Sequence, residues 1–384
     1  MKRKIRVLHL THTDITVDSR ILKTIGALSE MDLDIFGVGR ISRFDKNDCL
    51  RDLDFSYHPI GVRSSAYKFI PKVILKSVTF FEFYFKYISM CFRLKPDIIH
   101  AHDVIVLPVA TFYKCFANVK LIYDSHELSS NKNGNSKLHN RISFFVEKLC
   151  WSRINNLIVV SHSINQWYQK NIGNRDSIVT FNSPMIEMGQ PENKKYLRQK
   201  FLIPEEKKIL IYVGKFIKGR GIEQLINAFS KNELSNLHVV FLGDGHLQKF
   251  VVDASVELKN VHHHAPVPHY EVVKMCRSAD FGLCLLENVS LSDYLSLPNK
   301  LFEYAFSGLP IIASNFPEIT LFLKDTNSGF AISNDFNSVQ EFLQNLESNN
   351  YQLPMISVNR LQHYSWNQQA HKIKRLYYKL LEAF

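Results

Sequence analysis

The chain has 384 residues, of which 46% are hydrophobic, and it carries a formal net charge of +11. Because single cores stop growing at roughly 250–300 residues, we expect two domains. The six cysteines are scattered without a CxxC pair, which argues against a disulfide framework or a zinc site and fits a reducing cytoplasm.

The start of the sequence is not expected to be a secretory leader. Met1 to Lys4 are mostly basic, but the apolar run that follows, Ile5–Leu10, has the length of a strand, and no small-residue cleavage site comes after it. We therefore expect a cytoplasmic protein.

The first half of the chain alternates short apolar runs with longer helical patterns, which is typical of βαβ units and parallel sheets. Helices are expected near residues 19–31, 68–94, 106–115 and 139–154. The expected strands are Ile5–Leu10, Leu33–Val38, Ile98–His100, Lys120–Tyr123, Leu157–Val160 and Ser177–Thr180.

A polar segment with prolines separates this half from a second alternating series. We predict a first domain over residues 1–182, a linker over 183–206, a second domain over 207–365 and a closing amphipathic helix over 366–384. Both domains are expected to be doubly wound α/β sheets, which bind ligands at the carboxyl ends of their strands. The strands predicted in the second are Lys208–Val213, Leu237–Leu242, Val261–His263, Phe281–Leu285 and Leu309–Ala313.

A basic and aromatic segment, Tyr67–Lys95, indicates a partner. Its internal charges argue against a transmembrane helix. Positive charge interleaved with aromatic residues favours an anionic membrane surface over nucleic acid. The alternative is a core helix whose lysine stems lie over apolar surface.

Histidines and carboxylates follow two of the predicted strands. His102 and Asp103 come after one strand, and His126 and Glu127 come after the next. These positions lie where an open parallel sheet presents functional groups. Histidine moves protons or donates hydrogen bonds near neutral pH, so these residues are either functional or structural hydrogen-bonding groups.

The loop after the first strand contains Asp18 and Arg20. Asp18 is placed to cap the following helix, and the loop is expected to face the ligand-binding cleft. No metal-ligand spacing is evident there. We interpret the Asp-x-Asp triplets at 32–34 and 52–54 as surface carboxylates, so that no metal site is expected.

The second domain opens with a basic loop. Gly214, Lys215 and Arg220 follow the strand Lys208–Val213. Lysine and arginine neutralise phosphate charge, so this loop suits a diphosphate, the alternative being a solvated turn. Gly243 follows the next strand, where it either lets the backbone pass close to a ligand or neighbouring strand, or simply makes a turn.

The segment Leu297–Ser314 combines a helix start, a cation and a carboxylate. Pro298 and Asn299 suit the beginning of a helix, and Lys300 and Glu303 share a face of its first turn. The unpaired N–H groups at Asn299–Leu301 suit a phosphate. The carboxylate of Glu303 suits a sugar diol, so the segment resembles the donor site of a nucleotide-sugar transferase.

Eight short motifs, in order along nearly the whole chain, resemble the GT-B glycosyltransferases and in particular the large retaining family numbered four. This resemblance implies two Rossmann-like domains that face a central cleft. The motifs are Asp18–Arg20, Pro96–Asp103, Tyr123–Glu127, Ile158–Ser161, Tyr212–Gly221, Phe241–Gly245, Ala279–Leu283 and Leu297–Pro310.

The resemblance also implies roles for single residues. Lys215, Arg220 and the helix start at Asn299–Leu301 would hold the diphosphate of a nucleoside diphosphate sugar. Glu303 would bind the ribose hydroxyls, and His126 would lie beside the reacting sugar. The family usually needs no metal, and we expect no cofactor besides the nucleotide-sugar co-substrate.

Two departures from the family pattern are visible. The cationic pair is inverted, with Lys215 before Arg220. Many members also carry a second glutamate eight residues before the position of Glu303, where this chain has Leu295. Candidates to replace that acid are Glu287, Ser290 and Asp293, and the donor sugar is left open.

We therefore expect a retaining glycosyltransferase, cytoplasmic and peripheral at the inner face of the cell membrane. It would transfer a sugar to a lipid-linked glycan during the synthesis of a capsule, O-antigen or exopolysaccharide. The alternatives are a nucleotide-sugar 2-epimerase or a glycan phosphorylase on the same fold, or a non-catalytic basic protein that binds membrane or nucleic acid. The sequence does not specify the base, the acceptor or the linkage.

Overall fold

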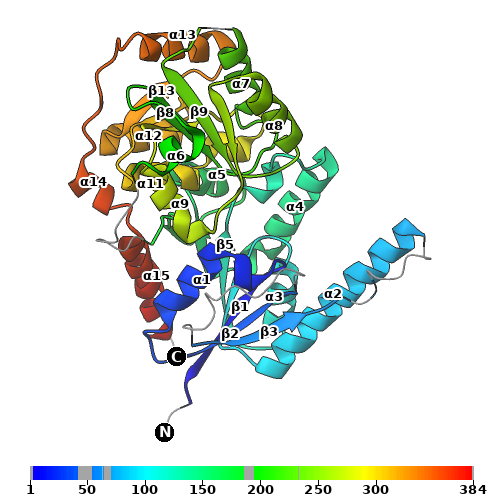
Figure 1. Cartoon of the computed structure of the whole chain (residues 1–384). Helices are drawn as coiled ribbons and strands as arrows, with labels where there is room; N and C mark the ends of the chain where they lie inside the picture. Colours follow the sequence, from blue (N-terminus) through cyan, green and yellow to red (C-terminus); the bar gives the residue numbers. More distant parts are fainter. Residues whose placement is uncertain are drawn as a thin grey trace. The chain divides into compact units, whose positions relative to one another are not determined.

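The computed structural model describes residues 3–41, 54–62, 64, 71–185, 194–231 and 233–382. The chain forms two compact units, one comprising Met1–Thr180 with Ala370–Phe384 and the other Phe181–Gln369 (Figure 1). The helix predicted as a separate closing element, α15 (Trp366–Leu381), is divided between these units.

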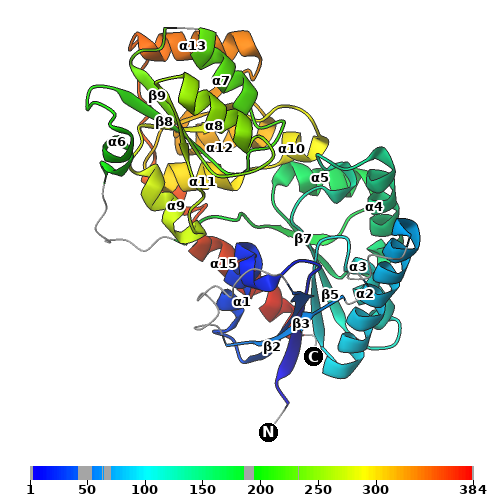
Figure 2. The same ribbon diagram turned by 45° about the vertical axis from the view of Figure 1, so that its right-hand side comes forward.

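The first unit is built on a parallel sheet with the strand order β3-β2-β1-β4-β5-β6-β7. Figure 2 shows helices α1 and α15 on one face of this sheet and α2, α3 and α4 on the other. The bounds are β1 Ile5–Leu10, α1 Ser19–Leu28, β2 Leu33–Arg40, β3 Ser56–Ile60, α2 Lys72–Leu94, β4 Ile98–His102, α3 Leu107–Lys114, β5 Lys120–Ser125, α4 Lys137–Cys150, β6 Asn156–Val159, α5 His162–Asn171 and β7 Asp176–Val179.

The second unit is also a parallel sheet, with the order β10-β9-β8-β11-β12-β13. Helices α7, α8 and α13 pack on one face through a continuous apolar core. The bounds are α6 Tyr196–Phe201, β8 Lys208–Val213, α7 Ile222–Lys231, β9 Leu237–Leu242, α8 Gln248–Glu257, β10 Val261–His264, α9 His269–Cys276, β11 Phe281–Cys284, α10 Leu291–Leu295, α11 Asn299–Phe306, β12 Ile311–Ser314, α12 Pro317–Thr326, β13 Gly329–Ile332, α13 Phe336–Glu347 and α14 Val358–Gln362.

Each sheet reverses its strand order at one point. In the first unit β1 lies between β2 and β4, and in the second β8 lies between β9 and β11. At such a point the loops leaving adjacent strands diverge and leave room for a ligand beyond the carboxyl ends. The predicted doubly wound α/β architecture is therefore confirmed, and it fixes where each unit presents its functional residues.

Central strands are buried on both sides, as expected for parallel sheets covered by helices. All five residues of β4, including His100 and His102, are inaccessible to solvent, and so is His9 of β1. Buried imidazoles need polar partners, because an unpaired buried polar group is costly. These partners form the site of the first unit.

Several elements were not predicted. The edge strand β3 contains Pro59 and alternates irregularly, which hides it from a pattern search. The short helix α10 was also missed, because five residues show no helical period.

Residues 67–70 of the basic aromatic segment lie outside the described residues. Within those described, no helix is both long and apolar enough to cross a membrane.

Candidate active site

Two glycines bring the loops after β8 and β9 together. Gly214 has φ of +127° and Gly243 has φ of +149°, which favour glycine. A Cβ atom on Gly243 would lie 2.0 Å from the carbonyl oxygen of Gly214. The close approach predicted for Gly243 is therefore to the loop of the neighbouring strand.

Lys300 lies next to the point where the loops after β8 and β9 come together. Its Nζ lies 3.7 Å from the place where a Cβ of Gly214 would sit, and 3.8 Å from the ring centroid of Tyr212. Burial, with a contribution from nearby Arg220, lowers the pKa of Lys300 to about 8. An anion bound beside Gly214 would stabilise the charged form of this ammonium group.

Arg220 forms an ion pair with Asp293 of α10. Its guanidinium lies 3.1 Å from Oδ1 of Asp293, and Oδ2 of Asp293 accepts a hydrogen bond from the Ser290 hydroxyl at 2.8 Å. Ser290 also caps α10, which fixes Asp293 in the first turn. Of the three candidates to replace the acid missing at Leu295, Asp293 thus contacts a predicted donor-binding cation.

Lys215 is placed differently from Arg220. Its side chain is 73% exposed, and its ammonium group pairs with Asp244 at 2.5 Å. Lys215 belongs to the loop after β8 and Asp244 to the loop after β9, so this ion pair joins the two loops. Lys215 is therefore a solvated charge, whereas Lys300 and Arg220 are half-buried.

The beginning of α11 differs in detail from the prediction. Pro298 is the N-cap residue, Asn299 is the first helical residue and is exposed, and no side chain caps the helix. The N–H group of Leu301 donates to the carbonyl of Pro298 at 3.1 Å, and its side chain is fully buried. Leu301 therefore serves packing, and its N–H group is already engaged.

Tyr304, which sequence reasoning missed, fixes α11 against the sheet. Its hydroxyl accepts a hydrogen bond from the N–H of Val213 at 2.9 Å and donates one to the carbonyl of Leu283 at 3.1 Å. The Cγ atom of its ring lies 2.3 Å from the position that a Cβ atom on Gly282 would occupy. The ends of β8 and β11 thereby set the position of the helix that carries Lys300.

Glu303 lies one turn inside α11 and is buried. Its Oε1 lies 3.7 Å from Nε2 of His269, the first residue of α9. Lys300 and Glu303 are three residues apart on α11, and the Glu303 carboxylate acts to raise the pKa of Lys300 against the larger effect of burial. The second unit thus gathers two half-buried cations, one exposed cation and a buried carboxylate beyond β8.

The site of the first unit is centred on Asp124, at the end of β5. The guanidinium of Arg20 donates to both its carboxylate oxygens, at 2.8 and 3.1 Å, and to the hydroxyl of Thr180 at 2.8 Å. Asp124 is fully buried, and although burial alone would raise its pKa, Arg20 and His126 hold that pKa well below the usual range. Asp124 was not among the predicted site residues, although it precedes His126 by two positions.

Three histidines form a hydrogen-bonded chain beside Asp124. Nδ1 of His9 lies 3.0 Å from Nε2 of His102, and Nδ1 of His102 lies 3.1 Å from Nε2 of His126. His100 joins the cluster through its Nε2, which lies 3.5 Å from Oδ2 of Asp124, and its Nδ1 lies 2.9 Å from the hydroxyl of Tyr377. Burial lowers the pKa of His9 and His102 well below the ordinary value, so both are neutral near pH 7.

His126 is the charged end of this chain. Burial opposes its protonation, but Asp103 and Asp124 outweigh burial and raise its pKa to about 9. Its Nδ1 lies 3.9 Å from Oδ2 of Asp103 and its Nε2 lies 3.6 Å from Oδ2 of Asp124. Asp103 has φ of +68°, an uncommon conformation for a residue with a side chain, which places it beside the functional cluster.

The remaining predicted residues of the first unit have structural partners. Asp18 caps α1 by accepting from the N–H groups of Arg20 and Ile21, as predicted. Glu127 pairs with Lys132, while burial raises the pKa of its carboxyl group. Asp32 of the first Asp-x-Asp triplet forms an exposed pair with Lys4, and Asp52 lies outside the described residues.

The histidine cluster contains two sets of close ligand-type atoms, His9 with His100 and His102, and His102 with Asp124 and His126. The rings of His100 and His102 stack at 4.4 Å with 12° between their planes, which directs their nitrogens along parallel lines. Asp124 is already bound by Arg20. This geometry is that of a hydrogen-bonded chain, and the absence of a metal requirement stays a prediction.

Comparisons with known proteins place both parts of the chain in glycosyltransferase families. Residues 193–359 match the family described as "Glycosyl transferases group 1", and residues 48–182 match "Glycosyltransferase Family 4". A D-inositol 3-phosphate glycosyltransferase of Corynebacterium diphtheriae is 20% identical over 314 residues, which cover 75% of this chain and 72% of that protein.

Solved structures share the fold. Sucrose-phosphate synthase from Thermosynechococcus elongatus has a TM-score of 0.78 at 15% identity, covering 99% of this chain and all of the other. Anabaena HepE in complex with UDP-glucose has a TM-score of 0.73 at 12% identity, covering 98% of this chain and 100% of that chain. The chain is a glycosyltransferase of the GT-B class.

Proposed function

We propose that this glycosyltransferase takes its sugar from a nucleoside diphosphate sugar bound beyond β8 in the second unit, and transfers it with retention of configuration. The observation that carries the proposal is Lys300, a half-buried ammonium group at the start of α11, beside Gly214 and Arg220. A departing diphosphate carries charge that these cations and the helix start would stabilise. Lys215 and the backbone near Gly243 complete the proposed donor site.

Glu303 would bind the ribose hydroxyls, because its buried carboxylate lies one turn behind Lys300 on the same helix. The HepE structure contains UDP-glucose, which supports a uridine nucleotide as the first donor to test. The sugar itself is left to experiment, since Asp293 occupies the region of the missing acid and is turned to Arg220.

His126 would contact the reacting sugar in the first unit. A protonated imidazole at the end of β5 donates a hydrogen bond to a sugar oxygen, and Asp103 and Asp124 keep it protonated near neutral pH. No covalent nucleophile is proposed. Catalysis would rest on positioning and on stabilisation of the leaving diphosphate.

We further propose that the protein works at an anionic membrane surface on a lipid-linked glycan of surface polysaccharide synthesis. On α2, Phe81 and Phe85 are 70% and 74% exposed, whereas Tyr87 and Cys91 are buried, so this helix is partly core and partly an apolar surface. Phe92 of α2 continues this surface to Phe116, which follows α3, with ring centroids 6.0 Å apart.

The neighbouring helix α4 presents a second apolar stripe. Leu138, Ile142, Phe145 and Leu149 are each more than half exposed and recur at helical spacing. Exposed basic side chains flank the stripe, namely those of Lys137, Arg141 and Lys148. An apolar stripe between cations is typical of a helix at an anionic lipid interface.

Sugar transfer tests the catalytic part of this proposal. The purified protein is incubated with UDP-, GDP- and dTDP-sugars and a membrane extract of glycolipids, and transfer of label to lipid is measured. We expect transfer from one donor, and loss of transfer in Glu303→Gln with an unchanged melting temperature. Full activity of Glu303→Gln would contradict the assigned donor site.

Vesicle flotation tests the membrane part. The double variant Ile142→Ser/Phe145→Ser should float less with phosphatidylglycerol vesicles than the wild type. The control Leu321→Ser/Val256→Ser removes two other exposed apolar side chains, from the second unit, and should float like the wild type. Equal flotation of all three proteins would contradict membrane binding through α4.

A further inference from the structure

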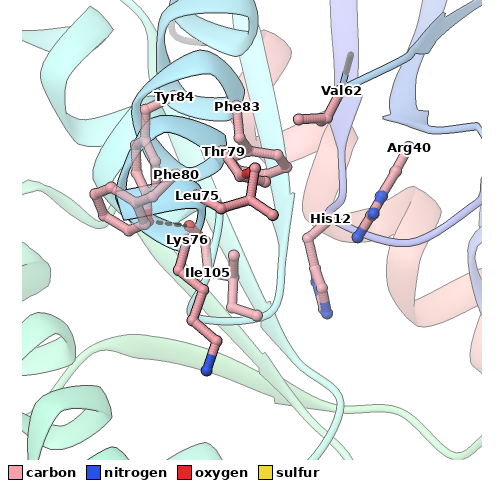
Figure 3. Close-up of a pocket in the computed structure, with 10 residues that line it drawn as sticks. All are labelled: His12, Arg40, Val62, Leu75, Lys76, Thr79, Phe80, Phe83, Tyr84 and Ile105. Carbon is pink, nitrogen blue, oxygen red and sulfur yellow. Dashed lines mark hydrogen bonds between the residues drawn. The ribbon is translucent and has the colours of Figure 1, made fainter. Parts of the chain in front are cut away.

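The first unit contains a pocket that the proposed catalytic residues do not use. It has a volume of about 480 Å³, within the range of small-molecule sites. Successive turns of α2 form one wall of the pocket, and Figure 3 shows the side chains of Leu75, Thr79, Phe80 and Phe83 on it. Most of this wall is apolar, so it suits a hydrocarbon chain.

Three nitrogen-bearing side chains also line the pocket. Figure 3 shows His12 and Arg40 across the pocket from the α2 wall, and Lys76 projecting from α2 itself. Among the described residues that line the pocket, none carries a carboxylate. Arg40 and Lys76 are both exposed, and neither forms a salt bridge with another residue that the structure describes.

His12 connects the pocket to the histidine cluster. It lies within electrostatic range of Asp103 and His126, and burial lowers its pKa, so that it is a neutral hydrogen-bonding group near pH 7. Its Nδ1 is buried without a partner among the described residues. A polar head group lying between His12 and Arg40 would therefore approach the proposed reaction centre of this unit.

Phe80 connects the other side of the pocket to the apolar surface. It lines the pocket and is 54% exposed, and its ring lies 5.8 Å from that of Phe81, which is largely exposed. A chain that leaves the pocket past Phe80 therefore passes onto the apolar face of α2. The pocket is thus cationic towards His12 and apolar towards the face proposed to meet lipid.

We propose that this pocket binds the phosphate and the first part of the hydrocarbon chain of a lipid phosphate, so that the acceptor is an amphiphile anchored through its phosphate. Arg40 and Lys76 bind the phosphate oxygens, and the apolar wall from Leu75 to Phe83 packs on the chain. This inference rests on the proposed glycosyl transfer to a lipid-linked acceptor and names the part of the acceptor that is recognised.

Calorimetric titration of the full-length protein with farnesyl phosphate, farnesol and glucose 1-phosphate tests the inference. We expect farnesyl phosphate to bind roughly tenfold more tightly than either of the others, because only it satisfies both parts of the pocket. In Arg40→Gln/Lys76→Gln this preference over farnesol should disappear. The control Lys259→Gln/Lys324→Gln, which removes two exposed cations of the second unit, should keep it.

A second variant, Leu75→Trp, fills the apolar wall and should weaken farnesyl phosphate while leaving UDP binding unchanged. Equal affinities for farnesol and farnesyl phosphate, or wild-type affinity in Arg40→Gln/Lys76→Gln, would overturn the inference. Tight binding of glucose 1-phosphate alone would replace the lipid with a soluble sugar phosphate. UDP binding, measured in the same samples, reports on the donor proposal separately, because failure there leaves the farnesyl phosphate result to be judged by itself.

Discussion

The guanidinium of Arg20 grips the carboxylate of Asp124 through two hydrogen bonds of 2.8 and 3.1 Å, with both side chains almost completely buried. The pair joins α1 to the end of β5, and it keeps Asp124 ionised beneath the histidine cluster. Two predictions follow from the low dielectric around it, because a buried charge that loses its partner is costly.

Arg20→Met should destabilise the first unit by about 3–5 kcal/mol, since Asp124 is left buried and unpaired. Urea unfolding followed by tryptophan fluorescence measures the loss. The double variant Arg20→Met/Asp124→Leu should recover part of it, because no uncompensated charge remains. Lys249→Met, which breaks the exposed pair with Asp253, serves as the control and should leave the unfolding midpoint nearly unchanged. A midpoint for Arg20→Met equal to that of the control would refute the assignment.

His126 should make stability depend on pH. Its pKa in the folded protein is about 9, against about 6.5 when unfolded, so protonation stabilises the fold. This contribution is complete below pH 6.5 and is lost as the pH rises through 9, and it amounts to about 3 kcal/mol. His126→Gln should therefore cost more stability at pH 6 than at pH 9.5, as measured by urea unfolding at both values. An equal cost at the two values would show that His126 is not protonated in the fold.

Tyr304→Phe should cost about 1–3 kcal/mol of stability, because the N–H of Val213 loses its acceptor. It should also weaken UDP binding, since α11 is no longer fixed to β8 and β11. Tyr87→Phe is a matched control, because Tyr87 is equally buried and donates to the carbonyl of Thr11 in the first unit. The control should lose stability and keep nucleotide affinity, and a parallel loss of affinity in both variants would argue against this positioning role.

Asp293→Asn should weaken nucleotide affinity although Asp293 is an acid near a proposed phosphate site. The reason is that Asp293 fixes Arg220, whose guanidinium lies 3.1 Å away. If Asp293 instead repelled the diphosphate, its neutralisation would tighten binding. Fluorescence titration with UDP distinguishes the two signs, and Asp253→Asn, at an exposed position on α8, controls for the change in net charge.

Most of the architecture could be predicted because it follows from the local pattern of apolar and polar residues. Apolar runs such as Ile5–Leu10 and Lys208–Val213 became the strands at the centre of each sheet. The edge strand β3 could not be predicted in this way, because Pro59 and its polar neighbours lack the buried period of a central strand. Asp18 was predicted as a helix cap, since capping depends only on residues next to it in the chain.

The same distinction applies to the site residues: those that depend on near neighbours in the chain were predicted, and those that depend on distant partners were missed. Lys300 and Glu303 were found because they share one helix turn. Asp124 and Tyr304 were missed because their importance comes from partners far along the chain, Arg20 for one and Val213 with Leu283 for the other. The predicted beginning of a helix at Pro298 and Asn299 agrees with the structure, in which Pro298 is the N-cap residue and Asn299 is the first residue of α11.

The central claim is that the second unit binds a nucleoside diphosphate through Lys300 and Arg220. Titration calorimetry of UDP, GDP and dTDP with the wild type and with Lys300→Met tests it most directly. We predict that at least one nucleotide binds the wild type, and that Lys300→Met weakens this binding roughly tenfold while Lys324→Met does not. Absence of binding by all three nucleotides, or equal affinity in wild type and Lys300→Met, would contradict the account.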